Sequence, residues 1–428
     1  MVLVAILTVI IAVAGADSSA ERHATASMAF GVLGATCSAD RVAALRQAGV
    51  SAVELPLAWD RFEPRRGGTD RQYVADVRKR LETCRDAGLK VLLSPGLQYP
   101  PAWVRKLPGG QLKANDGGVL KNGPAEVIFS SEVREAAKEY LARLLSITGV
   151  EDIAAVRVGT NATGELGYPG PSDDGDDPRY WGFGDAPQQG KGLAAGVLPS
   201  PMPGWIPGSA SWNGRAVNSR QVQEWWDWYA GAAIGAVVWQ VNELRALGYQ
   251  GRVQVPVAGR GVLPADKAKA IAGYLDGRAN PDGAQERGLD YVAQFKVLSQ
   301  LSGVDVDFTG LDDVSAVKAR AALANQDSCQ PGDDHAVEGD VALWSSHRYT
   351  SALARRAGLG LVGENPGPPD SPSTGGSEWS DSLADQLSRA PRYAAECGMS
   401  MFLFGFEDNL FDDGRSGVTV DDYRGVIR

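Results

Sequence analysis

The stretch Ile153-Ala-Ala-Val-Arg-Val-Gly-Thr160 predicts a short buried β-strand, because it is almost continuously apolar and ends at a glycine and a threonine. The segment before it predicts a helix that ends near Gly149. The apolar residues of this helix lie three and four positions apart: Val133, Ala137, Tyr140, Leu141 and Leu144. The segment after the strand, residues 164–218, is rich in Gly, Pro and Asp and predicts a long loop.

The same unit of strand and helix recurs along the chain. Further apolar runs predict strands at 28–34, 51–57, 89–97, 252–257, 304–309, 358–363 and 400–405. Helices are expected after Ser38, around Tyr73 to Cys84, at 221–247, and on Trp379, Leu383 and Leu387. Apolar strands that alternate with helices form a parallel sheet covered on both faces, and eight such units close into a barrel.

We therefore expect a single (β/α)8 barrel with long loop insertions on its C-terminal face, occupying residues 17–428. A doubly wound open sheet is the alternative. It would usually carry a G-x-G-x-x-G phosphate loop after the first strand, and Gly31-Val-Leu-Gly34 does not match that pattern.

The beginning of the chain predicts an export signal. An apolar run at residues 2–13 precedes Ala14-Gly15-Ala16, which resembles a cleavage site, so residues 1–16 are expected to be a signal peptide and the protein to be secreted. The run is short for a membrane span, and we expect no stable membrane insertion. A buried N-terminal strand and a membrane anchor are the alternatives.

Charge and cysteine content exclude several classes of function. The formal net charge of −10, without a long Lys/Arg run, disfavours nucleic acid as a partner and suits a neutral substrate. Export would permit the four cysteines, Cys37, Cys84, Cys329 and Cys397, to form up to two disulfides, with three possible full pairings. None of their spacings is C-x-x-C, which disfavours a structural zinc or thioredoxin-like site. Asp173, Asp174, Asp176 and Asp177 form an acidic cluster that is more typical of a solvated loop than of a calcium site.

Two glutamates follow predicted strands, at the end of the barrel where function resides. Glu165 follows the fourth strand in Gly-Glu-Leu-Gly-Tyr-Pro, and Glu364 follows the seventh in Gly-Glu-Asn. Either residue alone is more often an exposed or ion-paired side chain. Together they suit glycosidic bond cleavage, which commonly needs one carboxyl group as acid and another as nucleophile or base.

These stretches resemble those of barrel glycoside hydrolases. Gly164-Glu165-Leu166-Gly167-Tyr168-Pro169 and Gly363-Glu364-Asn365 are similar to the acid and base stretches of β-amylase. Leu57-Ala-Trp59-Asp-Arg-Phe-Glu63-Pro64 and Tyr99-Pro-Pro-Ala-Trp103 resemble the second and third strand loops of the β-galactosidase clan. The resemblance covers most of the chain in element order, but its specific motifs cover a small part.

The resemblance implies a glycoside hydrolase with Glu165 as general acid/base and Glu364 as nucleophile. On this basis Glu165 should have a raised pKa and Glu364 should be ionised. The β-amylase-like motifs favour Glu364 as a base on water instead. The Asn-Glu pair of the β-galactosidase clan is split here, since Asn161 lies four residues before Glu165, and this leaves the stereochemistry open.

Further residues are expected to contact a carbohydrate substrate through ring faces or polar groups. They are Asn161, Tyr168, Trp59, Trp103, Trp181, Trp344, Asn365 and Glu407. For each Trp, packing in the core is an equally good interpretation. Glu54 is given no role, because the sequence does not decide whether its side chain points into the barrel or away from it.

No cofactor or metal is expected. The chain has three histidines, His23, His335 and His347, and lacks a G-x-S-x-G elbow, which disfavours a Ser-His-Asp hydrolase. A carbohydrate-binding barrel without turnover is the second hypothesis, and a metal-dependent phosphodiester hydrolase is a weaker third. The sequence leaves the sugar, the linkage and the oligomeric state open.

Overall fold

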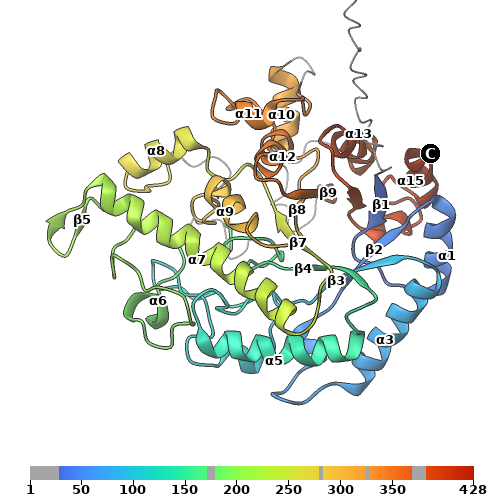
Figure 1. The fold of residues 1–428 in the computed structure, drawn as a ribbon, viewed down its shortest axis with the longest axis horizontal. Coiled ribbons are helices and arrows are strands. Elements are labelled where there is room, and N and C mark those ends of the chain that lie inside the picture. The colour runs from blue at the N-terminus through green and yellow to red at the C-terminus, as the bar shows by residue number, and fades with distance from the viewer. Residues whose placement is uncertain (1–27, 171–178, 279–282, 324–326, 369–381) are drawn as a thin grey trace, which may run out of the picture.

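A closed barrel of parallel strands forms the centre of the molecule (Figure 1). The computed structural model describes residues 28–428 except 171–178, 279–282, 324–326 and 369–381. Within these residues the strand order around the barrel is β1-β10-β9-β8-β7-β4-β3-β2. The strands are β1 Ala29–Val32, β2 Ala52–Pro56, β3 Lys90–Ser94, β4 Ile153–Arg157, β7 Arg252–Val257, β8 Val304–Phe308, β9 Gly360–Glu364 and β10 Met401–Phe404.

The eight strands expected from the sequence are all present, and the (β/α)8 barrel is confirmed. Three expectations lie outside the described residues: the signal peptide at 1–16, the acidic cluster at Asp173–Asp177, and the placement of Trp379. No helix of the described part of the chain is long and apolar enough to cross a membrane.

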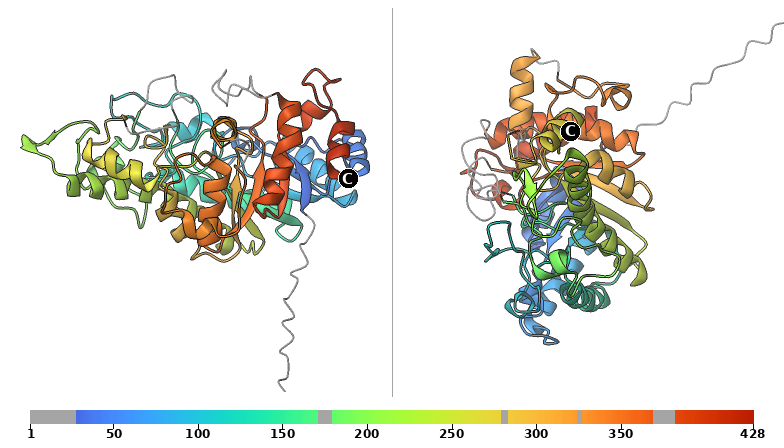
Figure 2. Two further views of the ribbon diagram at one scale, coloured as in Figure 1. Left: turned by 90° about the horizontal axis from the view of Figure 1, so that it is seen from above. Right: turned by 90° about the vertical axis from the view of Figure 1, so that its left-hand side faces the viewer.

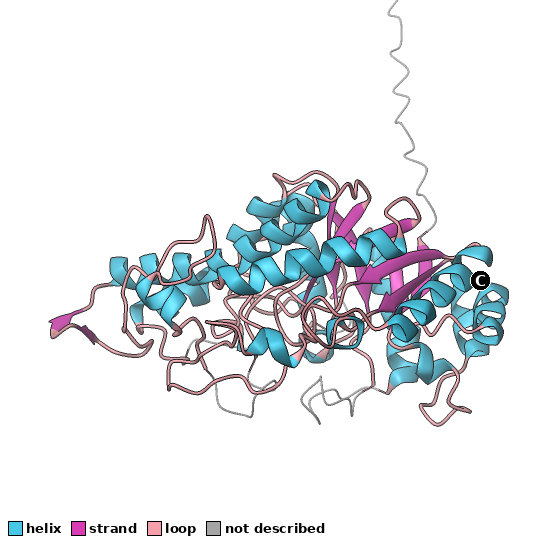
Figure 3. Ribbon diagram, turned by 90° about the horizontal axis from the view of Figure 1, so that it is seen from below, coloured by secondary structure: helices cyan, strands magenta, loops and turns pink. Residues whose placement is uncertain are grey.

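Helices surround the barrel, so that the strands lie together inside and the helices outside (Figure 3). The longer helices are α1 Ala39–Ala48, α3 Arg71–Asp86, α5 Ser131–Thr148, α7 Ser219–Ala246, α8 Pro264–Ala272, α9 Tyr291–Leu298, α10 Val314–Ala322, α12 Ser346–Arg356, α13 Leu383–Glu396 and α15 Val420–Ile427. The shorter helices are α2 Trp59–Phe62, α4 Ala102–Arg105, α6 Asp185–Gln189, α11 Asp333–Ala336 and α14 Glu407–Leu410. A two-stranded hairpin, β5 Ser211–Trp212 with β6 Arg215–Ala216, projects at one end of the molecule (Figure 2).

Alternation along each strand decides which side chains reach the interior of the barrel. On β2, Val53 and Leu55 pack in the large core beneath the helices, so Glu54 between them points inward. A separate small cluster fills the interior of the barrel, and its member Leu92 is the register partner of Glu54 on the neighbouring strand β3. The cluster consists of Leu33, Leu92, Ala155, Val362 and Leu403. The orientation of Glu54, which the sequence left open, is therefore inward.

The same parity brings charged residues into the interior near the C-terminal ends of the strands. Arg157 follows Ala155 by two positions on β4, and Glu364 follows Val362 by two on β9. Asp307 is the inward residue of β8 between the core residues Val306 and Phe308. The barrel interior thus holds charged residues near the C-terminal ends of β4, β8 and β9, together with the apolar cluster.

The long segment after β4 packs on the aromatic face of α7. Tyr168 stacks on Tyr229 with ring centroids 4.1 Å apart, and Tyr229 stacks on Trp225 at 4.9 Å. The helix begins at a capping box in which Asn218 and Gln221 satisfy each other's backbone N–H groups. This packing anchors a segment that has little regular structure of its own.

Two disulfides join segments that are distant in the sequence. Cys37 pairs with Cys84, and Cys329 pairs with Cys397, with sequence separations of 47 and 68 residues. The first ties the loop after β1 to α3, and the second ties the segment after α10 to the end of α13. Of the three pairings that the sequence allowed, the structure selects this one.

Removal of the first disulfide, by Cys37→Ser with Cys84→Ser, should lower the free energy of unfolding by about 4 kcal/mol, because the unfolded chain regains the entropy of a long closed loop. Urea denaturation of the double variant and of the wild type measures this difference. The pair Cys329→Ser with Cys397→Ser should cost a similar amount. An unchanged midpoint in both variants would contradict the pairing.

Candidate active site

Glu364 is the last residue of β9 and lies buried at the mouth of the barrel. Nη2 of Arg157 lies 3.2 Å from both of its carboxylate oxygens. The next residue, Asn365, holds the neighbouring strand end: its Oδ1 accepts from the backbone N–H of Gly405 at 2.9 Å, and its Nδ2 donates to Gln386 at 3.0 Å. Glu364 is thus fixed both by its backbone and by an arginine from across the mouth.

Arg157 is shared between Glu364 and a second carboxyl group. The same Nη2 atom lies 3.1 Å from Oδ2 of Asp307, a side chain that is 0% exposed. Apart from this contact, neither oxygen of Asp307 has a hydrogen-bond partner in the described part of the chain. Glu54 is buried on the same interior face and accepts from the backbone N–H of Gly34 at 2.8 Å.

These contacts place one cation among three buried carboxyl groups. Burial raises the pKa of Glu364 well above its ordinary value, and Asp307, Glu165 and Glu54 raise it further, whereas Arg157 opposes the change. Burial also raises the pKa of Asp307, and the charge of Arg157 again lowers it by a smaller amount. Although burial disfavours its charge, the carboxylates raise the pKa of Arg157 and keep it a cation.

Glu165 lies in a different environment, on the loop after β4. Oε1 accepts from Thr309 at 2.7 Å, and Oε2 accepts from Arg287 at 2.7 Å. Oε2 also accepts from Thr163 at 2.9 Å and from Asn161 at 3.2 Å. Burial disfavours the charged carboxylate, but Arg287 and the three other hydrogen bonds outweigh it and hold the pKa of Glu165 below its ordinary value.

The charge states expected from the resemblance are therefore reversed in this structure. A raised pKa was expected for Glu165 and an ionised carboxylate for Glu364. The structure surrounds Glu165 with hydrogen-bond donors that include Arg287 at 2.7 Å, whereas Glu364 shares Arg157 with Asp307. The sequence reasoning missed this because Arg287 and Asp307 lie far from the two glutamates along the chain.

Asn161 shapes the loop that carries Glu165. Its Oδ1 accepts from the backbone N–H groups of Glu165 at 2.7 Å and Thr163 at 3.1 Å, and its side chain is buried. Gly159 permits the turn, because a Cβ there would lie 1.9 Å from the carbonyl oxygen of Gly164. Asn161 is therefore placed to position Glu165, and its expected contact with a sugar stays a prediction.

Three of the aromatic residues expected to contact sugar are buried in the core: Trp59, Tyr168 and Trp181. Trp59 stacks on Tyr140, and the indole N–H of Trp181 donates to the carbonyl of Pro169 at 3.0 Å. Without an exposed ring face these side chains have no surface to offer a sugar, so the expectation is corrected to a packing role.

Glu407 and His347 are also packing residues. Glu407 is fully buried and accepts from the backbone N–H of Thr36 at 2.9 Å and from Arg41 at 2.9 Å, which ties the start of α14 to the loop after β1 and to α1. Its expected contact with substrate is therefore corrected. His347 is buried against Tyr393, and burial lowers its pKa to about 3, so it is neutral.

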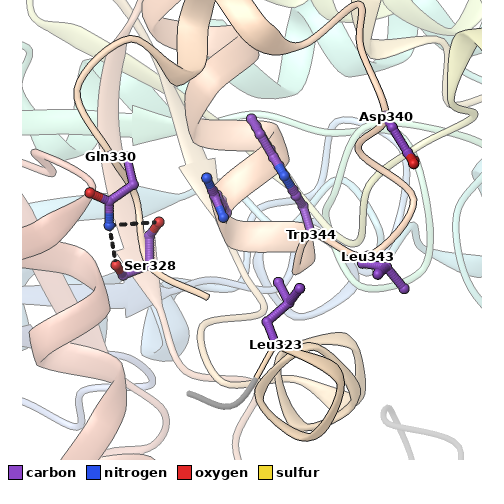
Figure 4. Close-up of a pocket in the computed structure, with 7 residues that line it drawn as sticks. Leu323, Ser328, Gln330, Asp340, Leu343 and Trp344 are labelled. Atoms are coloured by element: carbon purple, nitrogen blue, oxygen red, sulfur yellow. Dashed lines mark hydrogen bonds between the residues drawn. The ribbon is translucent and has the colours of Figure 1, made fainter. Parts of the chain in front are cut away.

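Trp103 and Trp344 are half-buried and lie in different parts of the fold. The indole N–H of Trp103 donates to the backbone carbonyl of Glu63 at 3.1 Å. Trp344 lines a cavity of about 600 Å³ with Leu323, Leu343 and the hydrogen-bonded pair Ser328 and Gln330 (Figure 4). This cavity lies between α10 and α12, outside the group of residues around Glu165 and Glu364.

The structure adds residues that the motifs did not reveal. Thr309 and Arg287 contact Glu165, and Arg157 and Asp307 belong to the group around Glu364. Strand alternation was a usable signal for Arg157 and Asp307, since both share the parity of inward residues. Arg287 stands in a loop, and no local pattern indicates it.

The comparisons with known proteins concern the fold. No protein-family model matches the chain, and no curated protein matches it significantly in sequence. The catalytic domain of β-amylase from Paenibacillus polymyxa is similar in structure, with a TM-score of 0.59 and 14% identity over 94% of this chain and 98% of that one.

Two β-galactosidases are also similar in structure. The enzyme from Bacillus circulans sp. alkalophilus has a TM-score of 0.56 and 12% identity over 94% of this chain and 55% of its own. The enzyme from Marinomonas ef1 has a TM-score of 0.54 and 12% identity over 93% and 62%. At these identities the likeness establishes the fold, and the resemblance to both kinds of barrel is confirmed at that level.

The packing role of Tyr168 is testable with Tyr168→Phe. This change removes the hydrogen bond from its hydroxyl to the carbonyl of Tyr229, 3.1 Å long, and keeps the ring stack. The free energy of unfolding should fall by about 0.5–1.5 kcal/mol, measured by urea denaturation. Affinity for carbohydrate should not change, and a large loss of affinity with unchanged stability would restore the substrate-binding role.

Proposed function

We propose that this protein is a glycoside hydrolase that uses Glu165 and Glu364 as its two catalytic carboxyl groups. The observation that carries the proposal is their convergence at one mouth of the barrel. Arg157 from β4 reaches Glu364 on β9, and Thr309 after β8 reaches Glu165. Two carboxyl groups that flank one opening are the usual requirement for hydrolysis of a glycosidic bond.

Exposed aromatic side chains at the same mouth suit a carbohydrate substrate. Tyr99 is 47% exposed and lies in the loop after β3, at the C-terminal end of the barrel strands. Phe406, 39% exposed, follows β10, and its ring lies against the backbone of Gly34 and Gly367. The C–H faces of a pyranose ring pack on such rings.

In the proposed reaction Glu165 donates a proton to the glycosidic oxygen while Glu364 attacks the anomeric carbon. The leaving sugar departs as an alcohol. Glu165 then removes a proton from water as the water oxygen attacks the anomeric carbon, the bond from that carbon to Glu364 breaks, and the sugar is released with retained configuration. An inverting course, in which Glu364 activates water directly, is the alternative. A binding barrel without turnover is less well supported, because it would need neither of the two carboxyl groups that converge at the mouth.

We also propose that the protein is secreted. The apolar run at residues 2–13 is typical of an export signal, and the two disulfides suit an oxidising compartment.

Glu165→Gln and Glu364→Gln should each lower the rate of hydrolysis by at least about a hundredfold, since each removes a carboxyl group needed in the transition state. The measurement is release of reducing sugar from a panel of polysaccharides and para-nitrophenyl glycosides. Glu243→Gln, on the outer helix α7, is the matched control and should keep full activity. Wild-type activity in both site variants would refute the assignment.

The configuration of the first-formed product distinguishes the two courses. Retention is expected, and proton NMR recorded in the first minutes of hydrolysis reports the anomer before mutarotation. Retention corresponds to carboxyl groups about 5–5.5 Å apart, and inversion to about 6.5–9.5 Å. An inverted first product would assign Glu364 as the base on water.

A further inference from the structure

The two glutamates differ in how their negative charge is compensated. Glu165 has Arg287 at 2.7 Å and hydrogen bonds from Thr309, Thr163 and Asn161. Glu364 has one nitrogen of Arg157 at 3.2 Å from both oxygens, and that nitrogen also lies 3.1 Å from Asp307. Short contacts to an ionised group are stronger than long ones that are divided among three oxygens.

The charges that face each group support the same distinction. Glu364 faces Arg157 and Glu165 from β4 and its loop, Asp307 from β8 and Glu54 from β2. Glu165 faces Arg287, with Tyr291, Asp307 and Glu364 as further titratable neighbours. Like-charged carboxyl groups that share a buried site do not ionise together, so a proton is retained around Arg157.

We propose that Asp307 and Arg287 are positioning residues that hold the free enzyme in the protonation state opposite to the one the reaction needs. Arg287 keeps Glu165 ionised, and Asp307, by competing for Arg157, leaves the proton on Glu364. This inference rests on the proposed function, in which Glu165 must be protonated and Glu364 ionised. The competent form differs by the move of one proton from Glu364 to Glu165, with no change in total charge.

The consequence is that only a small fraction of the enzyme is competent at any pH. The ratio of the two forms falls about tenfold for each unit by which the pKa of Glu364 exceeds that of Glu165. In a plot of kcat/KM against pH, Glu165 then sets the acid limb and Glu364 sets the alkaline limb. The assignment of limbs is the reverse of that for an enzyme with a protonated Glu165.

Asp307→Asn tests the proposal, because it removes a charge and nearly preserves shape. Asp307 is 0% exposed, so the change does not touch substrate. The pKa of Glu364 should fall, because residue 307 then carries no negative charge that repels the Glu364 carboxylate or competes with it for Arg157. We expect the alkaline limb to move to lower pH, and kcat/KM at the optimum to rise about tenfold for each unit of that shift, measured on the para-nitrophenyl glycoside that the wild type cleaves fastest.

If Asp307→Asn instead moves the acid limb to lower pH and leaves the maximum unchanged, Glu364 is the ionised group in the free enzyme and the proposal is overturned. Asp305→Asn is the matched control: Asp305 lies two residues earlier on β8 and pairs with Arg252, and its change should leave both limbs in place. A shift with Asp305→Asn as large as with Asp307→Asn would also overturn the proposal.

Thermal unfolding establishes that Asp307→Asn is folded. If it is not, Glu54→Gln supplies a second test, since it removes another carboxyl group that faces Glu364 and should move the same limb in the same direction by less. A Glu54→Gln variant that moves only the acid limb counts against the proposal.

A direct titration separates this inference from the proposed function. Carboxyl carbons of glutamate, labelled with ¹³C, are followed by NMR in the wild type, and the signals of Glu165 and Glu364 are assigned by their loss in Glu165→Gln and Glu364→Gln. Glu165 should titrate at lower pH than Glu364. This order supports the inference even if no glycoside is cleaved, and the opposite order overturns it even in an active hydrolase.

Discussion

The sharing of Arg157 between Glu364 and Asp307 is the interaction on which the chemistry of this barrel depends. Barrel closure brings the inward residues of all eight strands into one interior, and near the C-terminal end those of four strands are charged: Glu54, Arg157, Asp307 and Glu364. A buried carboxylate is costly without a partner, and one guanidinium does not neutralise several of them. The position and the charge of Glu364 are thus decided by residues on two other strands.

The loop that carries Glu165 projects from the end of β4 and is held in place by hydrogen bonds from several segments. Asn161 closes the turn on itself, and Arg287 and Thr309 hold the carboxylate from other segments. The segment beyond it is anchored by the stack of Tyr168 on Tyr229 of α7. Tyr168, which the sequence suggested as a sugar contact, therefore packs in the core and anchors the segment that follows Glu165.

The electrostatics and the motif resemblance lead to different charge states for the same two residues. The motifs concern which atoms lie near a glycosidic bond, whereas the protonation state follows from every charge within several ångströms. The roles implied by the motifs and the protonation states set by the surrounding charges agree if the catalytically competent protonation state is a minor form of the free enzyme. The roles of Glu165 and Glu364 can then follow the motif pattern while their average charges do not.

The sequence by itself determined the eight strands, their parallel order in a barrel, and the places of Glu165 after β4 and of Glu364 at the end of β9. These features depend on local periodicity, because apolar runs and helical spacing are read within a few residues. Only the tertiary structure decided the partners of the two carboxyl groups. Arg287 is 122 residues from Glu165, and Arg157 is 207 from Glu364. It also decided the disulfide pairing and the burial of Trp59, Tyr168 and Trp181, since both follow from how separate segments pack.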